Sequence, residues 1–237
     1  MNLDFLKNNL IAHRGLHNDI IPENSIRAFK EAIKHNYIIE LDIHLLRDNT
    51  VVVFHDDNLK RMTGIDKKII DFNYDELKKI KLLNTNYNIP TLKEVLDLVD
   101  GKVPLIIELK YDRKVGLLEN ELVKLLDNYN GLFCVKSFNP FIVRWFKKHR
   151  KNYTRGLLVP YKYNNLKEFI LKKMYLIHIC SPHFLSCNYN LYNDKKVMKY
   201  HKKMPLLLWT IKTNNNYLKY KDRYDNLICE NINTFKI

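Results

Sequence analysis

Short apolar runs rich in β-branched residues alternate along the chain with longer segments of helical spacing. Eight of these runs have the length and composition of buried strands. Between most of them, apolar residues recur three or four positions apart, as at Leu118, Leu122 and Leu126, which indicates helices with one face toward a core. The expected strands are residues 10–13, 37–44, 103–109, 131–136, 154–159, 176–180, 205–211 and 226–230.

This alternation predicts an α/β fold, a (β/α)8 TIM barrel. A doubly wound open sheet is the alternative, but the chain has no glycine-rich phosphate loop of either common type. The 237 residues suffice for one domain of barrel size, so we predict a single domain over residues 1–237. In a barrel the functional residues lie at the carboxyl ends of the strands, which makes polar residues at strand ends the candidates for chemistry.

Residues 45–90 interrupt the alternation and are expected to form a hairpin and a small insertion after the second strand. Asp48 and Asn49 lie between two apolar runs, which is typical of a tight hairpin turn. If they are the two turn residues, antiparallel pairing sets His55 opposite Asp42. The hairpin would then return His55 to the mouth of the barrel.

Other local signals in this region indicate structure only. Residues 74–80 have the spacing of a short helix, and Thr91 followed by Glu94 is a capping box that opens the next helix. Earlier in the chain, Asn24 is expected to be the N-cap of the first helix.

Three acids fall at predicted strand ends. Glu40 and Asp42 are two residues apart on one strand and therefore face the same side, and Glu108 ends the next barrel strand. Carboxylates gathered in a barrel mouth repel one another unless they bind a cation. Three oxygen ligands without cysteine suit one hard divalent cation, Ca²⁺ or Mg²⁺, with Mn²⁺ also possible. The alternative is that each acid pairs with a lysine or an arginine.

Two histidines and two cations accompany these acids. His13 and His55 carry imidazoles with an ordinary pKa near 6.5, so they can serve as acid and base at neutral pH. Arg14 and Lys110 would clamp a phosphate group. Glu23 would hold Arg14 or the substrate, unless its role is structural. The set suits a metal-assisted attack on a phosphate ester.

Composition narrows the remaining possibilities. The formal net charge is +14, but the lysines are scattered along the chain and no nucleic-acid-binding motif is present, so nucleic acid is not the expected partner. The four cysteines form no CxxC pair and are expected to be buried, reduced thiols. The first ten residues lack the pattern of a signal peptide, and no apolar run approaches the roughly 20 residues that span a bilayer. We therefore expect a cytoplasmic protein, with peripheral membrane contact left open.

The ordered motifs resemble those of the glycerophosphodiester phosphodiesterase family. The resemblance implies a TIM barrel with a small insertion, a divalent metal on Glu40, Asp42 and Glu108, and His13 and His55 as the acid–base pair. It also implies phosphate contacts from Arg14 and Lys110. Trp209 matches an aromatic residue that lines the substrate pocket in relatives, although a core role is the alternative. The matching positions are His13-Arg14-Gly15, Pro22-Glu23-Asn24-Ser25, Glu40-Leu41-Asp42, Asp48, His55-Asp56, Arg61, Ile89-Pro90-Thr91-Leu92, Glu108-Leu109-Lys110, Ser137-Phe138 and residues 206–210.

The C-terminal quarter departs from the family pattern. Lys212 stands where relatives usually carry Asn, Glu230 replaces an Asp, and Ile232 replaces a Pro. These changes fall on the substrate side of the expected pocket, so the sequence leaves open which alcohol group the substrate carries.

Three functions are compatible with the sequence. The resemblance implies an enzyme that hydrolyses small glycerophosphodiesters to an alcohol and glycerol 3-phosphate. A second possibility is a lysophospholipase D-like hydrolase of lipid phosphodiesters at a membrane surface. A third is a non-catalytic barrel that binds a phosphorylated ligand, although a binder has no need of two histidines for proton transfer. The sequence leaves the native metal, the roles of the two histidines and the oligomeric state open.

Overall fold

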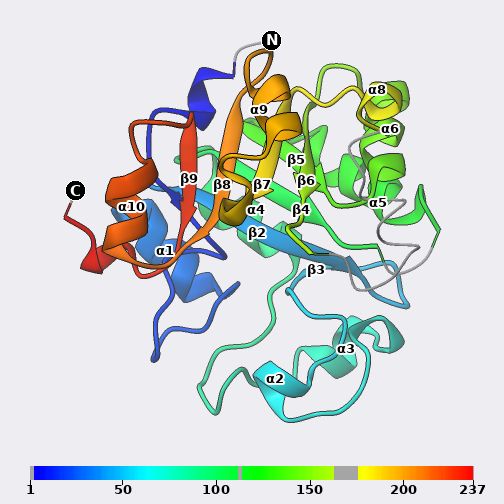
Figure 1. The fold of residues 1–237 in the computed structure, drawn as a ribbon. Helices are drawn as coiled ribbons and strands as arrows, with labels where there is room; N and C mark the ends of the chain where they lie inside the picture. Colours follow the sequence, from blue (N-terminus) through cyan, green and yellow to red (C-terminus); the bar gives the residue numbers. More distant parts are fainter. Residues whose placement is uncertain (1–2, 112–113, 163–175, 237) are drawn as a thin grey trace.

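A computed structural model describes residues 3–111, 114–162 and 176–236, and in them parallel strands close into a barrel (Figure 1). Strand β1 pairs in parallel with both β2 and β9, which joins the two edges of the sheet. The predicted (β/α)8 barrel is therefore confirmed. The barrel strands are β1 (Ile11–Ala12), β2 (Ile38–Leu45), β4 (Leu105–Leu109), β5 (Phe133–Ser137), β6 (Thr154–Val159), β7 (Phe184–Asn188), β8 (Leu206–Ile211) and β9 (Asn226–Cys229).

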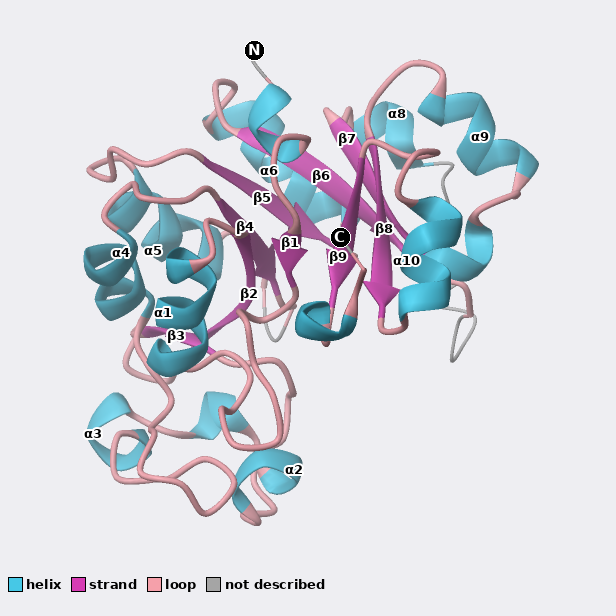
Figure 2. Cartoon of the chain, turned by 90° about the vertical axis from the view of Figure 1, so that its left-hand side faces the viewer, coloured by secondary structure: helices cyan, strands magenta, loops and turns pink. Residues whose placement is uncertain are grey.

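Helices cover the outside of the barrel with the apolar stripes that the sequence predicts (Figure 2). Helix α1 begins one residue later than expected, because the hydroxyl of Ser25, and not the amide of Asn24, accepts the N–H of Ala28. The predicted capping box of Thr91 and Glu94 is present at the start of α4. The outer helices are α1 (Ile26–Lys34), α4 (Leu92–Val99), α5 (Leu117–Leu126), α6 (Pro140–His149), α8 (Ile177–Cys180), α9 (Lys195–His201) and α10 (Asn214–Tyr220).

One predicted strand is wrong. Within residues 176–180 lies the short helix α8, Ile177–Cys180, which packs on α6, and the barrel strand at this point is β7, Phe184–Asn188. A five-residue apolar run is too short for its periodicity to separate a strand from a buried helical turn. Ser181, in the left-handed region at φ 43°, ends the helix and starts the connection to β7.

The half of the barrel interior near the amino-terminal ends of the strands is apolar. The turn η1 (Asp4–Leu6) closes that end with Phe5 and Leu6. A Cβ at Gly156 would lie 2.3 Å from the Phe184 ring, so only glycine leaves room for this ring. All four cysteines are buried and unpaired, as expected. The interior residues are Ile11, Ile38, Ile106, Cys134, Phe184, Leu207 and Ile228.

The hairpin after β2 is present, with a register one residue away from the predicted one. Strand β3 (Val51–Val53) runs antiparallel to β2 and sets Val51 opposite Leu45. The intervening loop holds residues 46–50, so the turn is longer than the two residues expected. In consequence Phe54, and not His55, lies beside Asp42, and its N–H donates to the Asp42 carbonyl at 3.0 Å.

The rest of the insertion lies at the end of the barrel toward which the arrowhead of β8 points (Figure 2). It contains helix α2 (Lys60–Thr63), the turn η2 (Ile69–Asp71) and helix α3 (Tyr74–Leu77), shorter than the expected 74–80. Two further turns, η4 (Tyr189–Leu191) and η5 (Ile232–Thr234), belong to the C-terminal half. The insertion has an apolar core of its own, formed by Leu46, Val52, Phe54, Leu59, Met62, Ile69, Leu77, Leu82 and Ile89.

Candidate active site

Three carboxylates converge above the apolar layer of the barrel. Asp42 of β2 lies in register with Glu108 of β4, and Glu40 precedes Asp42 by two residues on the same face. One oxygen from each side chain lies within 4.8 Å of the others, and all three residues are buried. Such a group of oxygen ligands could hold a hard cation. The structure thus brings together the three acids that the sequence singled out.

Two lysines neutralise these acids. The Lys110 ammonium lies 2.8 Å from Asp42 Oδ1 and 2.6 Å from Glu108 Oε1. Lys136 of β5 lies 2.8 Å from Glu40 Oε1 and 3.5 Å from Glu108 Oε2. Each acid therefore has a cationic partner, as the alternative expectation had it, and cation binding by the cluster stays a prediction.

Sequence reasoning did not identify Lys136 as part of the site. The signal was its place two residues after Cys134 on an apolar strand, which points both side chains into the barrel. Burial alone would lower the pKa of Lys136, but the charges of Glu40 and Glu108 outweigh burial and raise it. Lys136 therefore carries its charge at neutral pH.

The same balance keeps Asp42 and Glu108 ionised. Burial raises the pKa of a carboxyl group, yet Lys110 and the other nearby cations hold the pKa of Asp42 well below its usual value. The pKa of Glu108 is also lowered, for which burial is again outweighed by Lys110. Both groups are carboxylates, and not acids, at neutral pH.

A tight loop after β1 presents Arg14. Its backbone is left-handed at φ 56°, and its N–H donates to Glu40 Oε2 at 3.1 Å. Gly15 follows at φ 79°, where an added Cβ would come within 2.9 Å of Ala28, so only glycine fits. The guanidinium donates to Glu23 Oε1 at 2.7 Å and lies 3.4 Å from Asp42 Oδ2. Glu23 therefore binds Arg14, which is one of the two roles expected for it.

His13 lies between two carboxylates from different strands. Its Nδ1 donates to Glu230 Oε1 at 2.6 Å, and its Nε2 lies 3.9 Å from Glu40 Oε2. Lys212 in turn lies 2.7 Å from Glu230 Oε2. Burial would raise the pKa of Glu230, but the bond to His13 and the charge of Lys212 lower it. Lys212 and Glu230, two of the residues that depart from the family pattern, therefore pair with each other on the Nδ1 side of His13.

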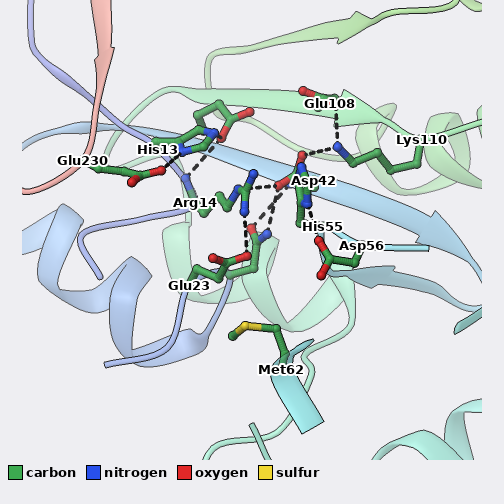
Figure 3. Close-up of polar contacts among 12 residues, drawn as sticks. His13, Arg14, Glu23, Asp42, His55, Asp56, Met62, Glu108, Lys110 and Glu230 are labelled. Carbon is green, nitrogen blue, oxygen red and sulfur yellow. Dashed lines mark hydrogen bonds and ion pairs between the residues drawn. The ribbon is translucent and has the colours of Figure 1, made fainter. Parts of the chain in front are cut away.

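His55 lies on the opposite side of Arg14 and Asp42 from His13 (Figure 3). Its Nδ1 donates to Asp56 Oδ1 at 2.6 Å, which fixes the ring as Glu230 fixes that of His13. The pKa of His55 is lowered, first by burial and then by the charge of Lys110. The bonds to Arg61 and His55 outweigh burial and lower the pKa of Asp56 to about 2.

Arg61 connects the insertion to the barrel loop. From helix α2 its guanidinium donates to Asp56 at 2.6 Å and 3.0 Å, and to Glu23 at 2.7 Å and 3.1 Å. Glu23 also binds Arg14, so a continuous chain of charge-assisted hydrogen bonds runs from His55 to Arg14. From the sequence, Arg61 could be identified only as a position that matches the family.

Asn24 has a different role from the expected one, whereas Trp209 makes the contacts of its core alternative. Asn24, expected as a helix cap, is buried at φ 53° and donates from Nδ2 to Asp42 Oδ2 at 3.0 Å, so it supports the acid cluster. Trp209 packs against the inner core and edge-on to Phe138, with ring centroids 5.7 Å apart. Its contacts are those of the core alternative, and its contact with a substrate stays a prediction.

Comparison with known proteins assigns the chain to a family. The model of the glycerophosphoryl diester phosphodiesterase family matches residues 13–234, which include every site residue described above. The chain belongs to this family. Its members are phosphodiesterases, so the chain belongs to a family of enzymes.

Individual members of the glycerophosphoryl diester phosphodiesterase family are moderately similar to the chain. A glycerophosphodiester phosphodiesterase of Caldanaerobacter subterraneus is 33% identical over 165 residues, 65% of this chain and 67% of that protein. Bacillus subtilis YhdW is 39% identical over 129 residues, so the chain spans 52% of that relative's length. An Oleispira antarctica phosphodiesterase solved with its product sn-glycerol-3-phosphate has the same fold, with 23% identity and a TM-score of 0.81 over 94% of this chain and 93% of that chain.

Among the helices described here, none is long and apolar enough to cross a membrane.

Proposed function

We propose that this chain hydrolyses glycerophosphodiesters to an alcohol and glycerol 3-phosphate, with a divalent cation bound in the barrel mouth. The observation that carries the proposal is the pair of carboxylate-bound imidazoles, His13 with Glu230 and His55 with Asp56, on either side of Arg14 (Figure 3). Two rings fixed in this way are suited to proton transfer in opposite directions. The family to which the chain belongs supports the same reaction.

Glu40, Asp42 and Glu108 would hold the cation. One oxygen of each buried carboxylate lies within 4.8 Å of the others. A set of three carboxylates, without a cysteine or histidine among them, fits Ca²⁺ or Mg²⁺, with Mn²⁺ as a further candidate. When bound, such an ion supplies positive charge to the phosphate and helps to orient it. Asn24 would keep the Asp42 carboxylate in place through its hydrogen bond to Oδ2.

Arg14 and Lys110 would bind the phosphate oxygens. Both side chains point toward Asp42 from opposite sides, and both are only slightly exposed, so they border the cluster where a substrate would enter (Figure 3). A guanidinium and an ammonium here would neutralise the diester and hold it in a fixed orientation. Glu23 would position Arg14 for this task.

The two histidines would move the protons. One imidazole removes the proton of a free glycerol hydroxyl, whose oxygen attacks phosphorus, and the other donates a proton to the departing alcohol oxygen as its bond to phosphorus breaks. The product of this step is a cyclic phosphate. In the second step the two imidazoles exchange roles. Water adds to phosphorus, and the cyclic phosphate opens at one of its two P–O bonds to glycerol, which gives glycerol 3-phosphate. Glu230 and Asp56 would keep each Nδ1 protonated and each Nε2 available for transfer.

A substrate panel on the purified protein tests the proposal. We expect release of glycerol 3-phosphate from glycerophosphocholine with added Ca²⁺, Mg²⁺ or Mn²⁺, and loss of activity in excess chelator. Full activity in chelator would contradict the metal site, and no turnover with any of the three ions would favour a binding barrel. Faster turnover of a lysophospholipid than of any soluble glycerophosphodiester would instead support the lipid-hydrolase alternative.

A further inference from the structure

Lys136 is a buried cation for which the reaction proposed above gives no role. It lies on β5 beside Glu108 of β4, on the interior side of the acid cluster, and its side chain is 2% exposed. Burying an ammonium is unfavourable unless it is paired, and its ion pairs in the described part of the chain are with Glu40 and Glu108. Both partners are residues that would hold the cation. Lys136 therefore belongs to the site.

Lys110 differs from Lys136 in its freedom to move. The side chain of Lys110 is 13% exposed and reaches Asp42 and Glu108 from the mouth. It can turn toward a phosphate and leave the acids. Lys136 has protein on every side, since its side chain is 2% exposed, and lies in register with Gly156 on one side and Glu108 on the other. Its charge stays beside Glu40 whether or not a substrate is bound.

We propose that Lys136 is a fixed counter-charge of the metal site and that it weakens and tunes cation binding there. This inference rests on the metal site of the proposed function. With Lys110 on the phosphate, the formal charges of Glu40, Asp42, Glu108 and Lys136 sum to −2, which matches one divalent ion. Lys136 also lies 2.8 Å from Glu40 Oε1, so its ammonium would compete with a bound ion for the Glu40 carboxylate. Without the lysine, the three acids would attract a divalent ion more strongly and would favour a trivalent one.

Calorimetric titration of the full chain measures this effect without relying on activity. The variants are Lys136→Met, which keeps the length of the side chain and removes its charge, and Lys93→Met as the control on α4. Lys93 forms an exposed ion pair with Asp97, so its loss tests the general effect of removing one positive charge. We expect Lys136→Met to bind Ca²⁺ about tenfold more tightly or better, because a nearby like charge has been removed from a poorly solvated site. The gain should be larger for La³⁺, and Lys93→Met should bind both ions as the wild type does.

The outcomes separate this inference from the proposed function. If the wild type binds none of Ca²⁺, Mg²⁺ and Mn²⁺, the metal site itself is wrong. If the wild type binds Ca²⁺ and Lys136→Met binds it equally or more weakly, the role of Lys136 is overturned while the metal site stands.

A second pair of variants covers the case in which Lys136→Met does not fold with Glu40 left uncompensated. Glu40→Gln keeps Lys136, and Glu40→Gln with Lys136→Met removes both charges of the pair, so the second protein has no unpaired buried carboxylate at this position. The two proteins offer the same ligands and differ only in the ammonium. We expect the double variant to bind Ca²⁺ about tenfold more tightly than Glu40→Gln. Equal or weaker binding by the double variant overturns the inference.

Discussion

The two histidines of the mouth are held by different parts of the molecule. His13 directly follows β1, and its carboxylate partner, Glu230, follows β9, the strand next to it in the barrel. His55 follows β3 in the insertion, and its partner is the adjacent Asp56. The side chain of His13 is 11% exposed, whereas that of His55 is 33% exposed. One ring is thus fixed by the closed sheet, and the other depends on where the insertion rests.

The insertion has few polar links to the barrel mouth but a substantial core of its own. The N–H of Phe54 donates to the Asp42 carbonyl, His44 Nε2 lies 3.3 Å from the His55 carbonyl, and Arg61 bridges to Glu23. The apolar core around Phe54 and Met62 is separate from that of the barrel. Changes at these links should therefore alter catalysis more than stability, while changes around His13 should affect both.

Removing either ring should have the largest effect. We expect His13→Ala and His55→Ala each to lower kcat by about 10²–10⁴-fold, because each loses one proton-transfer group. The double variant should be little slower than the slower single variant, since the two groups act together. Release of glycerol 3-phosphate is the measurement, and His35→Ala on the exposed end of α1 is the control. Near wild-type turnover by either single variant contradicts the assignment.

The carboxylate partners should show how the two halves differ. We expect Glu230→Gln to lower kcat by about 10–100-fold and Asp56→Asn by about tenfold, because both leave a neutral group on Nδ1 and Glu230 is the more buried. Glu230→Gln should also lower the melting temperature, because the mostly buried hydrogen bond from His13 to residue 230 loses its charge-assisted character. Glu230→Asp, which keeps the charge, should recover part of the rate, and Glu121→Gln, at a partly exposed acid of α5 that pairs with Lys124, should change neither quantity. A larger loss of rate in Asp56→Asn than in Glu230→Gln would reverse the comparison.

Much of this arrangement could be predicted from the sequence, and the failures have physical causes. Glu40, Asp42 and Glu108 were predictable because strand alternation and the parallel sheet place strand-end residues together. The hairpin register was one residue off because Asp48-Asn49 indicates a turn without fixing its length. Asn24 looked like a helix cap because its contact with Asp42 is long-range and leaves no local signal.

The C-terminal half was harder to predict for a related reason. A strand in the barrel is defined by its neighbours, so the short apolar run at 176–180 could not be told from the real strand, Phe184–Asn188. The pairing of Glu230 with Lys212 depends on the ends of the neighbouring strands β8 and β9 lying side by side. The sequence marked both positions as unusual but gave no reason to join them.

The bridge from Arg61 tests how the insertion is docked. We expect Arg61→Met to lower kcat/KM by about two- to fivefold, the range for partly exposed ion pairs, because His55 loses the anchor of its partner Asp56. The melting temperature should hardly change, since the Arg61 side chain is 46% exposed. Arg47→Met is the matched control, because Arg47 also lies in the insertion segment but pairs with Glu76, away from the mouth. Equal losses of rate in the two variants would mean that the bridge has no special role.

The smallest expected effect concerns the titration of His55. Its pKa lies below the ordinary 6.5 because burial disfavours the imidazolium and the Lys110 ammonium adds repulsion. Lys110→Met removes that ammonium, so the pKa of His55 should rise. The change can be followed by NMR titration of the ring proton in metal-free protein, with the exposed His35 as internal reference. A pKa that stays the same or falls in the variant would show that Lys110 does not set the charge of His55.

Stability should report the same coupling with a definite sign. Because the folded-state pKa of His55 is lowered, the unfolded chain binds a proton first as the pH falls below 6.5. His55 therefore reduces the free energy of unfolding in that range and has no such effect above it. In Lys110→Met the raised pKa should make this loss on acidification smaller, measured as the difference in unfolding free energy between pH 7.5 and pH 5.5, about a unit on either side of the ordinary value. A steeper loss in the variant than in the wild type would contradict this prediction, because it would mean that the pKa of His55 falls further when the Lys110 ammonium is removed.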